Sequence, residues 1–301
     1  MGGTSALPAE SIAAATEICI LVVDDDETAL FALTALLAPI GATVVEARSG
    51  EEALAAVDAQ EFAAVLLDVG MPGLDGFEVA RRIKTQRTSQ HTPIIFLTGH
   101  IDEAEIRRGY EVGAVDYLLK PIDPSVLQAK VGAFVDLARL RQQTAILTHR
   151  ALHDPLTGLA NRTLFFDRCE QALTRLGRET RQVGVLFLDL DEFKEVNDRY
   201  GHDTGDRLLI EAAARIQRAI RAVDTAARFG GDEFLILCEQ VVADEDMDRL
   251  RDRIVESLGD TSPPISVSIG YAVTGDPSMT GEELVREADH AMLRAKALAK
   301  R

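Results

Sequence analysis

The stretch RFGGDEF at residues 228–234 places two glycines directly before two carboxylates, and the apolar run LILC follows it. Gly230 and Gly231 suit a tight hairpin turn between two strands, and their missing side chains let a ligand lie against the backbone. A second acidic pair, Asp189 and Asp191 in FLDLDEF, ends another apolar run. Taken alone, the signature could be an ordinary hairpin with solvated acids. Four carboxylates near one sheet edge instead predict a divalent cation and a nucleoside triphosphate site.

Another set of residues suited to chemistry follows apolar runs in the first half of the chain. Asp24 and Asp25 end one run, and Asp68 ends another. In an open parallel sheet the carboxyl ends of the strands converge on one crevice, where three carboxylates favour Mg²⁺. Thr98 and Lys120 end two further runs. Each residue alone is better explained as a solvated loop residue, but together they predict transfer of a phosphoryl group onto a carboxylate.

The elements that must position these residues can be predicted from hydrophobic patterns. In the first half, apolar runs alternate with helical patterns, which predicts an α/β domain with a doubly wound parallel sheet of five strands. The expected strands are 18–23, 43–47, 63–68, 93–98 and 116–120. In the second half, a mixed α+β pattern predicts a largely antiparallel sheet. Its expected strands are 182–191, 224–229, 233–239 and 265–273.

These patterns divide the chain into four segments. We expect a flexible leader at 1–16, a first domain at 17–135 and a second domain at 153–301. A linker helix at 125–152 overlaps the last helix of the first domain. Its apolar residues recur at three- and four-residue steps, which favours a two-stranded dimer stalk over a helix that packs only on its own domain.

Composition excludes several classes of partner. The formal net charge is −17, which argues against nucleic acid and against an anionic membrane surface. No apolar run approaches the roughly 20 residues that span a bilayer, and the N-terminus lacks the positive start of a secretory signal. The three cysteines, Cys19, Cys169 and Cys238, are widely spaced and are interpreted as buried thiols. A cytoplasmic protein is therefore expected.

The first half resembles the receiver domain of bacterial two-component response regulators over about 17–135, through VVDDD, LLDVGMPGLDGFE, FLTG and DYLLKP. The resemblance implies that Asp68 accepts a phosphoryl group from a cognate sensor histidine kinase or phosphotransfer protein. It implies one Mg²⁺ held by Asp24, Asp25, Asp68 and the carbonyl of Gly70. It also implies switch roles for Thr98, Lys120 and Tyr117, and a cis peptide between Lys120 and Pro121. Gly99 stands where Ala is commoner in the family, which should loosen that loop.

The second half resembles the GGDEF family of diguanylate cyclases over about 153–301, through DPLTGLANR, DLDEFKEVNDRYGHDTGD, RFGGDEF and SVSIG. The resemblance implies condensation of two GTP into cyclic di-GMP and two pyrophosphates. One domain holds one GTP, so it also implies a homodimer with two domains set antiparallel, which phosphorylation would rearrange through the helix at 125–152.

The same resemblance assigns roles to individual residues. One or two Mg²⁺ would be held by Asp189, the Leu190 carbonyl, Asp232 and Glu233. Glu233 would also help to deprotonate the attacking 3′-hydroxyl, and Lys296 would contact the terminal phosphates. Asn197 and Asp206 would read the guanine edge. The remaining substrate-binding residues would be Phe193, Lys194, Gly230, Gly231 and Lys300. Arg221 and Asp224 would form a product-inhibition site, although an unknown protein would more often have a surface ion pair there.

The C-terminal motif departs from the family pattern, and two rival functions remain. The family often has Tyr where Leu293 stands, and Gly-Arg where Ala299 and Lys300 stand, which bears on phosphate affinity and turnover. A catalytically weak or silent receptor for GTP or cyclic di-GMP is the first rival, and the intact acids argue against it. A scaffold that dimerises or drains phosphate from a kinase is the second, and the complete nucleotide motif argues against that. A cyclase that makes a cyclic mononucleotide is a weaker variant.

Overall fold

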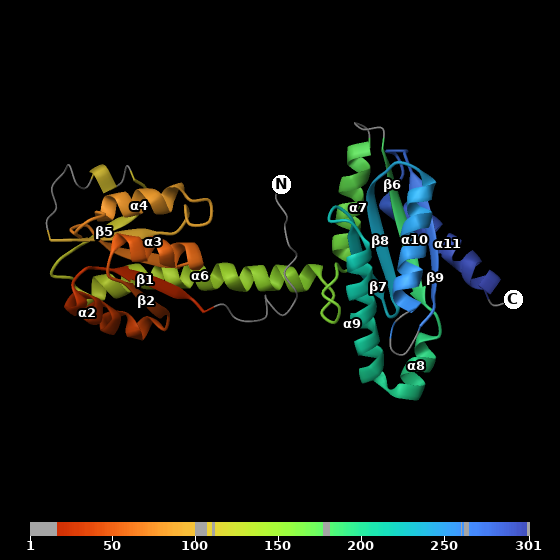
Figure 1. Cartoon of the computed structure of the whole chain (residues 1–301), viewed down its shortest axis with the longest axis horizontal. Coiled ribbons are helices and arrows are strands. Elements are labelled where there is room, and N and C mark those ends of the chain that lie inside the picture. The colour runs from red at the N-terminus through yellow and green to blue at the C-terminus, as the bar shows by residue number, and fades with distance from the viewer. Residues whose placement is uncertain are drawn as a thin grey trace. The chain divides into compact units, whose positions relative to one another are not determined.

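The computed structural model of the chain describes residues 17–99, 107–109, 112–176, 181–259, 261 and 265–299. The expected leader at 1–16 lies outside the described residues. The chain divides after Ile146 into two compact units, each built on its own sheet (Figure 1). The two units are described separately below.

The sheet of the first unit has five parallel strands, as predicted, in the order β2-β1-β3-β4-β5. The strands are β1 (Cys19–Val23), β2 (Thr43–Ala47), β3 (Ala64–Asp68), β4 (Ile94–Thr98) and β5 (Asp116–Leu119). Every residue of β1, β3 and β4 is buried, which explains why these strands appear as continuous apolar runs. Val23 pairs with Leu67, so the residues that follow β1 and end β3 reach the same edge.

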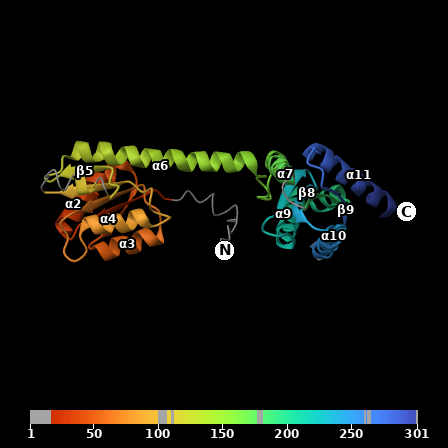
Figure 2. The ribbon, with the colours of Figure 1, turned by 90° about the horizontal axis from the view of Figure 1, so that it is seen from above.

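Helices cover both faces of this sheet. They are α2 (Glu27–Leu37), the 3₁₀ helix η1 (Ala38–Ile40), α3 (Gly50–Ala59), α4 (Gly76–Thr85) and α6 (Pro124–Leu152). Helices α3 and α4 lie on one side of the sheet and α6 on the other (Figure 2). Because strand side chains alternate between faces, Leu21 and Val23 pack with α3 and α4, whereas Ile20 and Val22 pack with α2 and α6. Each fully buried aliphatic side chain stabilises the fold by about 1.5–3 kcal/mol. The helical segment expected between β4 and β5 lies mostly outside the described residues.

Helix α6 is continuous from Pro124 to Leu152, close to the predicted span of 125–152. Its start packs on the sheet, where Val131 and Val135 are buried. Further along, Leu140 and Leu147 are 59% and 64% exposed. The predicted apolar stripe thus contributes to a core only over its first turns, and its role as a dimer stalk stays a prediction.

The second unit contains an antiparallel sheet of four strands, as predicted, and their order is β7-β8-β6-β9. The strands are β6 (Gln182–Leu190), β7 (Thr225–Gly230), β8 (Glu233–Val241) and β9 (Val267–Thr274). The helices are α7 (Arg162–Leu176), α8 (Phe193–Tyr200), α9 (His202–Ala219), α10 (Asp244–Gly259) and α11 (Gly281–Ala299).

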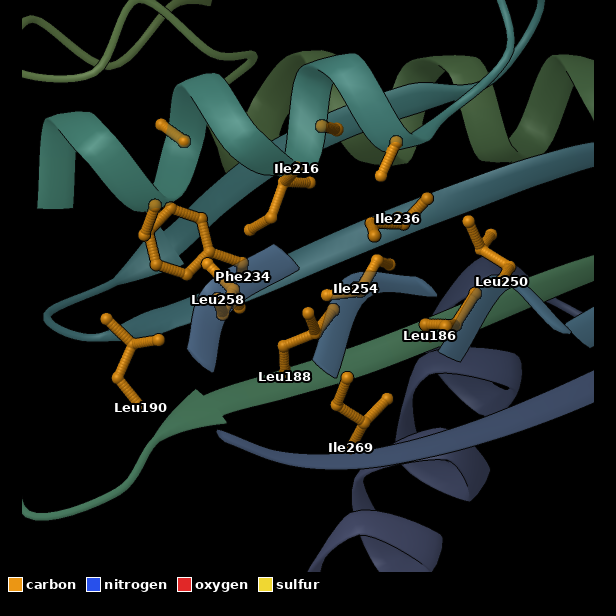
Figure 3. Close-up of a cluster of buried hydrophobic side chains, with 14 of the residues drawn as sticks. Leu186, Leu188, Leu190, Ile216, Phe234, Ile236, Leu250, Ile254, Leu258 and Ile269 are labelled. Carbon is orange, nitrogen blue, oxygen red and sulfur yellow. The ribbon is translucent and has the colours of Figure 1, made fainter. Parts of the chain in front are cut away.

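Two apolar cores sandwich this sheet. On one face, Leu186 and Leu188 of β6 and Phe234 of β8 pack against α9 and α10 (Figure 3). On the other face, Phe187 of β6 and Leu235 of β8 pack against α7 and α11. The alternation continues to the strand ends, so Asp189 and Glu233 belong to the face that α11 covers.

The hairpin of the signature is shifted by one residue from its expected position. Gly230 is the last residue of β7 and pairs with Glu233, so the turn consists of Gly231 and Asp232 rather than the two glycines. Gly231 has φ +52°, a conformation that glycine adopts without a steric penalty. The shift places Asp232 in the turn itself and Glu233 on the strand.

None of the described helices combines the length and the apolar composition that crossing a bilayer requires.

Candidate functional site

At the carboxyl edge of the first sheet, a lysine amine lies between two buried carboxylates. Lys120 Nζ donates to Asp24 Oδ2 at 2.7 Å and to Asp68 Oδ1 at 2.5 Å. Both acids are almost fully buried, with 1% and 7% of their surface exposed. Partial burial by itself lowers the pKa of Lys120, but the hydrogen bonds and charges of the two carboxylates outweigh it, and the pKa is raised. The amine thus compensates both buried charges.

Backbone groups and a close approach of α4 position Asp68. The Gly70 N–H donates to Asp68 Oδ2 at 2.8 Å, so the recorded contact uses the amide of Gly70 and not its carbonyl. A Cβ on Gly76, the first residue of α4, would lie 2.2 Å from the Asp68 carbonyl oxygen. Only glycine therefore lets α4 begin so near the end of β3.

The other residues predicted for this unit lie around that crevice in different environments. Asp25 is exposed, whereas Thr98 is buried at the end of β4. Tyr117 packs against Phe96 with ring centroids 5.5 Å apart. The peptide between Lys120 and Pro121 is cis, as expected. Asp24, Asp68 and Lys120 are in direct contact, while Asp25 does not share their burial.

In the second unit, the predicted acids collect at the end of the sheet beneath α11. Asp189 lies opposite Glu233 in the antiparallel register. Lys296 of α11 donates to Asp189 Oδ1 and lies 4.0 Å from Asp191 Oδ1. Asp191 also accepts a hydrogen bond from Ser268 Oγ at 2.7 Å. One cation thus contacts both members of the predicted pair, which agrees with their expected common face.

Carboxylates repel one another in this cluster. Burial raises the pKa of Asp232 first, and the charge of Asp189 raises it further. Burial likewise raises the pKa of Glu233, followed by the charges of Asp189, Asp232 and Asp289, while Lys296 opposes the shift. Asp289 was not predicted. It lies seven residues before Lys296, two helical turns away on the same side of α11, and that spacing is the signal that could have found it.

The donor sets of both crevices suit a hard divalent cation such as Mg²⁺, which prefers carboxylate oxygens. Within the described ranges, no three acidic, His or Cys side chains already converge as a preassembled metal site. Instead, Lys120 and Lys296 each lie among the carboxylates. Burial, and then the neighbouring carboxylates, raise the pKa of Asp232 and Glu233 although Lys296 opposes the shift, so the residues fit a bound cation.

An arginine that was not predicted clamps the signature hairpin. Arg228 donates from Nε and Nη2 to the Gly231 carbonyl oxygen at 3.0 and 2.8 Å, and from Nη1 to Asp154 at 3.2 Å. Thr157 donates to the same carboxylate, and these hydrogen bonds overcome burial to lower the pKa of Asp154. The clamp ties the segment that follows α6 to the turn that carries Asp232.

The predicted guanine-reading residues lie on the paired helices α8 and α9. Phe193 and Asn197 of α8 are half-buried, and a Cβ on Gly205 of α9 would contact both side chains. Asp206 and Lys194 are exposed. Lys300 and the side chain of Ala299 lie outside the described residues, and Leu293 is exposed. The structure therefore brings Phe193 and Asn197 together, and Asp206 follows the glycine that both contact.

The predicted inhibitory pair occupies a turn beside a small pocket. The Arg221 N–H donates to Asp224 Oδ2 at 3.0 Å, and the Asp224 N–H donates to the Arg221 carbonyl oxygen at 3.0 Å, so both hydrogen bonds use the backbone of Arg221. Burial raises the pKa of Asp224 despite the first of these bonds. The two residues line a pocket of about 100 Å³ together with Arg249 and Arg253 of α10, which were not predicted. Three guanidiniums share this pocket with the carboxylates of Asp224, Glu239 and Asp246, so it offers a ligand both hydrogen-bond donors and acceptors.

Comparisons with known proteins agree with this geometry. The family described as "Diguanylate cyclase, GGDEF domain" matches residues 151–301, and the family described as "Response regulator receiver domain" matches residues 20–132. The response regulator PleD of Caulobacter vibrioides is 28% identical over 92% of this chain, and the chain spans 63% of the length of PleD. The diguanylate cyclase TpbB of Pseudomonas aeruginosa is 41% identical over 54% of this chain and 39% of its own.

One solved structure extends the likeness to the fold. The coiled coil and GGDEF domain of DgcB from Caulobacter crescentus, in complex with c-di-GMP, is 27% identical. It covers 57% of this chain and 94% of its own chain, with a TM-score of 0.53.

Proposed function

Because the chain belongs to the GGDEF family of diguanylate cyclases and carries a response regulator receiver domain, we propose that it condenses two GTP molecules into cyclic di-GMP and two pyrophosphates. The observation that carries the proposal is the cluster of Asp189, Asp232 and Glu233 beside Lys296. The cluster lies at a hairpin turn that contains Gly231, which has no side chain to block a ligand. Carboxylates, a lysine and an open backbone are the groups that binding a metal-bound triphosphate requires.

Each group has a defined task in the reaction. A bound Mg²⁺ would neutralise phosphate charge and lower the pKa of the attacking hydroxyl. Asp189 and Asp232 would hold that ion, and Lys296 would contact phosphate oxygens. Glu233 has a raised pKa, which brings it closer to the range in which a carboxylate accepts a proton effectively. Asn197 and Asp206 would orient the guanine.

Two copies of the chain would form the catalytic unit. The 3′-oxygen of each GTP attacks the α-phosphorus of the other, a P–O bond forms, and pyrophosphate leaves with the electron pair. One site binds one nucleotide, so the reaction needs the second unit of one chain to face the second unit of another. The exposed apolar residues of α6, such as Leu140, support pairing of two copies along that helix.

Phosphorylation of Asp68 would control this arrangement. A carboxylate oxygen of Asp68 attacks the phosphorus of a phosphohistidine on the donor protein, and the P–N bond breaks with its electron pair returning to the imidazole. Lys120, which already contacts Asp68, neutralises the added charge. Thr98 and Tyr117 would respond to the new phosphate. A histidine kinase or phosphotransfer protein would supply the phosphoryl group, and α6 would carry the change to the second unit.

The direct test is incubation of the purified chain with GTP and Mg²⁺, followed by chromatography for cyclic di-GMP. We expect product, and about 5-fold or more of it after treatment with beryllofluoride, which mimics phospho-aspartate. Asp68→Asn should remove the activation and keep basal turnover. Asp58→Asn, an exposed acid of the same unit, is the matched control. Absence of product in both states would favour a GTP or cyclic di-GMP receptor, and undiminished activation of Asp68→Asn would refute the phosphosite.

The Arg221 pocket predicts feedback by the product. The cyclic di-GMP concentration that halves the initial rate should be about 10-fold higher in Arg221→Ala and in Arg253→Ala than in the wild type. Each substitution removes a guanidinium from the pocket. Arg218→Ala, an exposed arginine outside the pocket, should leave inhibition unchanged. Equal inhibition of all three variants would show that the product binds elsewhere.

A further inference from the structure

Gly205 occupies a position where glycine is unfavourable for the helix that contains it. It is buried in the first turns of α9, whose 18 residues form a regular helix. Glycine in a helix is less favourable than alanine by about 1 kcal/mol, and Gly205 is not among the glycines with positive φ. Backbone conformation therefore does not require glycine here, and the reason must lie in what surrounds the position.

The surroundings consist of side chains from α8. A Cβ on Gly205 would lie 1.9 Å from Asn197 Oδ1, 3.0 Å from Asn197 Cγ and 3.2 Å from Phe193 Cζ. The first distance is far below any van der Waals contact. The carboxamide of Asn197 thus occupies the space that a methyl group at position 205 would take. Gly201 alone separates α8 from α9, and its N–H caps α8 by donating to the backbone carbonyl oxygen of Asn197 at 2.9 Å.

The atoms that would collide identify what a larger residue would displace. Asn197 Oδ1 is the end of a rotatable side chain, so a methyl group at 205 can be accommodated by turning the carboxamide away. Gly270 of β9 provides the contrast, because its Cβ would lie 1.9 Å from the backbone nitrogen of Met292 in α11. There no side chain can move aside, and alanine should disturb the fold itself.

We propose that Gly205 is a specificity-determining positioning residue, which leaves open the place where the Asn197 carboxamide must lie to read a guanine base. The inference rests on the proposed function, since it needs GTP as substrate and Asn197 as a base reader. A primary carboxamide offers one acceptor and two donor hydrogens in a fixed plane, and its orientation decides whether they meet the base edge. Position 205 does not touch the base itself and acts through Asn197, whose Oδ1 is the atom nearest to the missing Cβ.

The test compares binding of a non-hydrolysable GTP analogue and of the matching ATP analogue by calorimetry, in the full chain with Mg²⁺. Gly205→Ala should weaken binding of the guanine analogue by about 10-fold or more and leave binding of the adenine analogue unchanged. Combining it with Asn197→Ala should add no further loss, because both changes remove the same contact. Gly259→Ala is the control, since a Cβ there meets no atom within 4 Å.

Each outcome has a distinct meaning. Unchanged preference for guanine in Gly205→Ala, or losses that add in the double variant, would overturn the role of Gly205 while the proposed function stands. A wild-type chain without preference for guanine would overturn both. If Gly205→Ala melts at a lower temperature, Asn197→Ala should restore its melting temperature by clearing the space. Failure to restore it would mean that the glycine serves backbone packing instead.

Discussion

Asp232→Asn is expected to abolish cyclic di-GMP formation and, at the same time, to raise the melting temperature of the metal-free protein. Loss of one carboxylate from the metal-binding set should lower kcat by about 10³-fold, comparable to the removal of one main electrostatic contact from an active site. Stability should move in the opposite direction because Asp189 and Asp232 repel each other. Both measurements, product formation with Mg²⁺ and melting in a chelator, can be made on one preparation.

The stability of the wild type and that of Asp232→Asn should depend differently on pH. The pKa values of Asp232 and Glu233 are raised in the folded protein, so their charged forms destabilise the fold at neutral pH. This penalty disappears as the pH falls through the folded pKa values toward the ordinary values of 3.8 and 4.5. In a chelator, the wild-type chain should therefore gain more stability than Asp232→Asn between pH 7 and pH 4.5.

The control for this prediction is Glu245→Gln, which removes an exposed acid of α10. It should keep full activity and the wild-type pH dependence. An Asp232→Asn protein that remains active, or that melts below the wild type in the chelator, would contradict the view that these acids are gathered for a cation.

Lys120→Met is expected to destabilise the first unit strongly. The lysine amine contacts Asp24 and Asp68, whose side chains are 2% and 10% exposed. Removing one partner from a buried ion pair leaves an uncompensated charge, which costs about 3–5 kcal/mol, and the 34% exposure of the lysine reduces this to about 2–4 kcal/mol. Denaturant unfolding in a chelator measures the difference.

Adding Mg²⁺ or lowering the pH should each restore part of the stability that Lys120→Met loses. A divalent cation supplies the missing positive charge if the crevice binds one, and protons neutralise the two carboxylates at low pH. Lys130→Met is the matched control, because its partner Asp116 and Lys130 itself are both 33% exposed. That pair should contribute about 1 kcal/mol or less. Equal destabilisation by the two variants would show that the crevice tolerates unpaired charge and would weaken its interpretation as a cation site.

The strands were predictable from local pattern. β3 and β4 are buried along their whole length, so they read as apolar runs bounded by polar residues. Asp68 and Thr98 could be placed at one edge because all strands of a parallel sheet end on the same side. In the second unit, the apolar runs at 182–191 and 233–239 put Asp189 and Glu233 on strands.

Contacts between distant elements could not be predicted in this way. The hairpin turn is Gly231 and Asp232 because Gly230 pairs with Glu233, and that register depends on how the whole of β7 fits β8. Asp25 is exposed whereas Asp24 is buried, because consecutive residues after a strand point in different directions, and the role of Asp25 at a cation site stays a prediction. Asp289 reaches the acids only through the docking of α11 on the sheet.

The amino-acid sequence by itself determined which residues are chemically able to act and on which strand ends they stand, because burial and period-two alternation are properties of short segments. Tertiary packing decided which of them meet. Lys120 lies between Asp24 and Asp68, Arg228 holds Gly231, and Asn197 rests against Gly205. Each of these contacts joins residues from separate elements that pack together in the folded chain. The hydrophobic pattern of a single element does not specify which residues of another element it will contact.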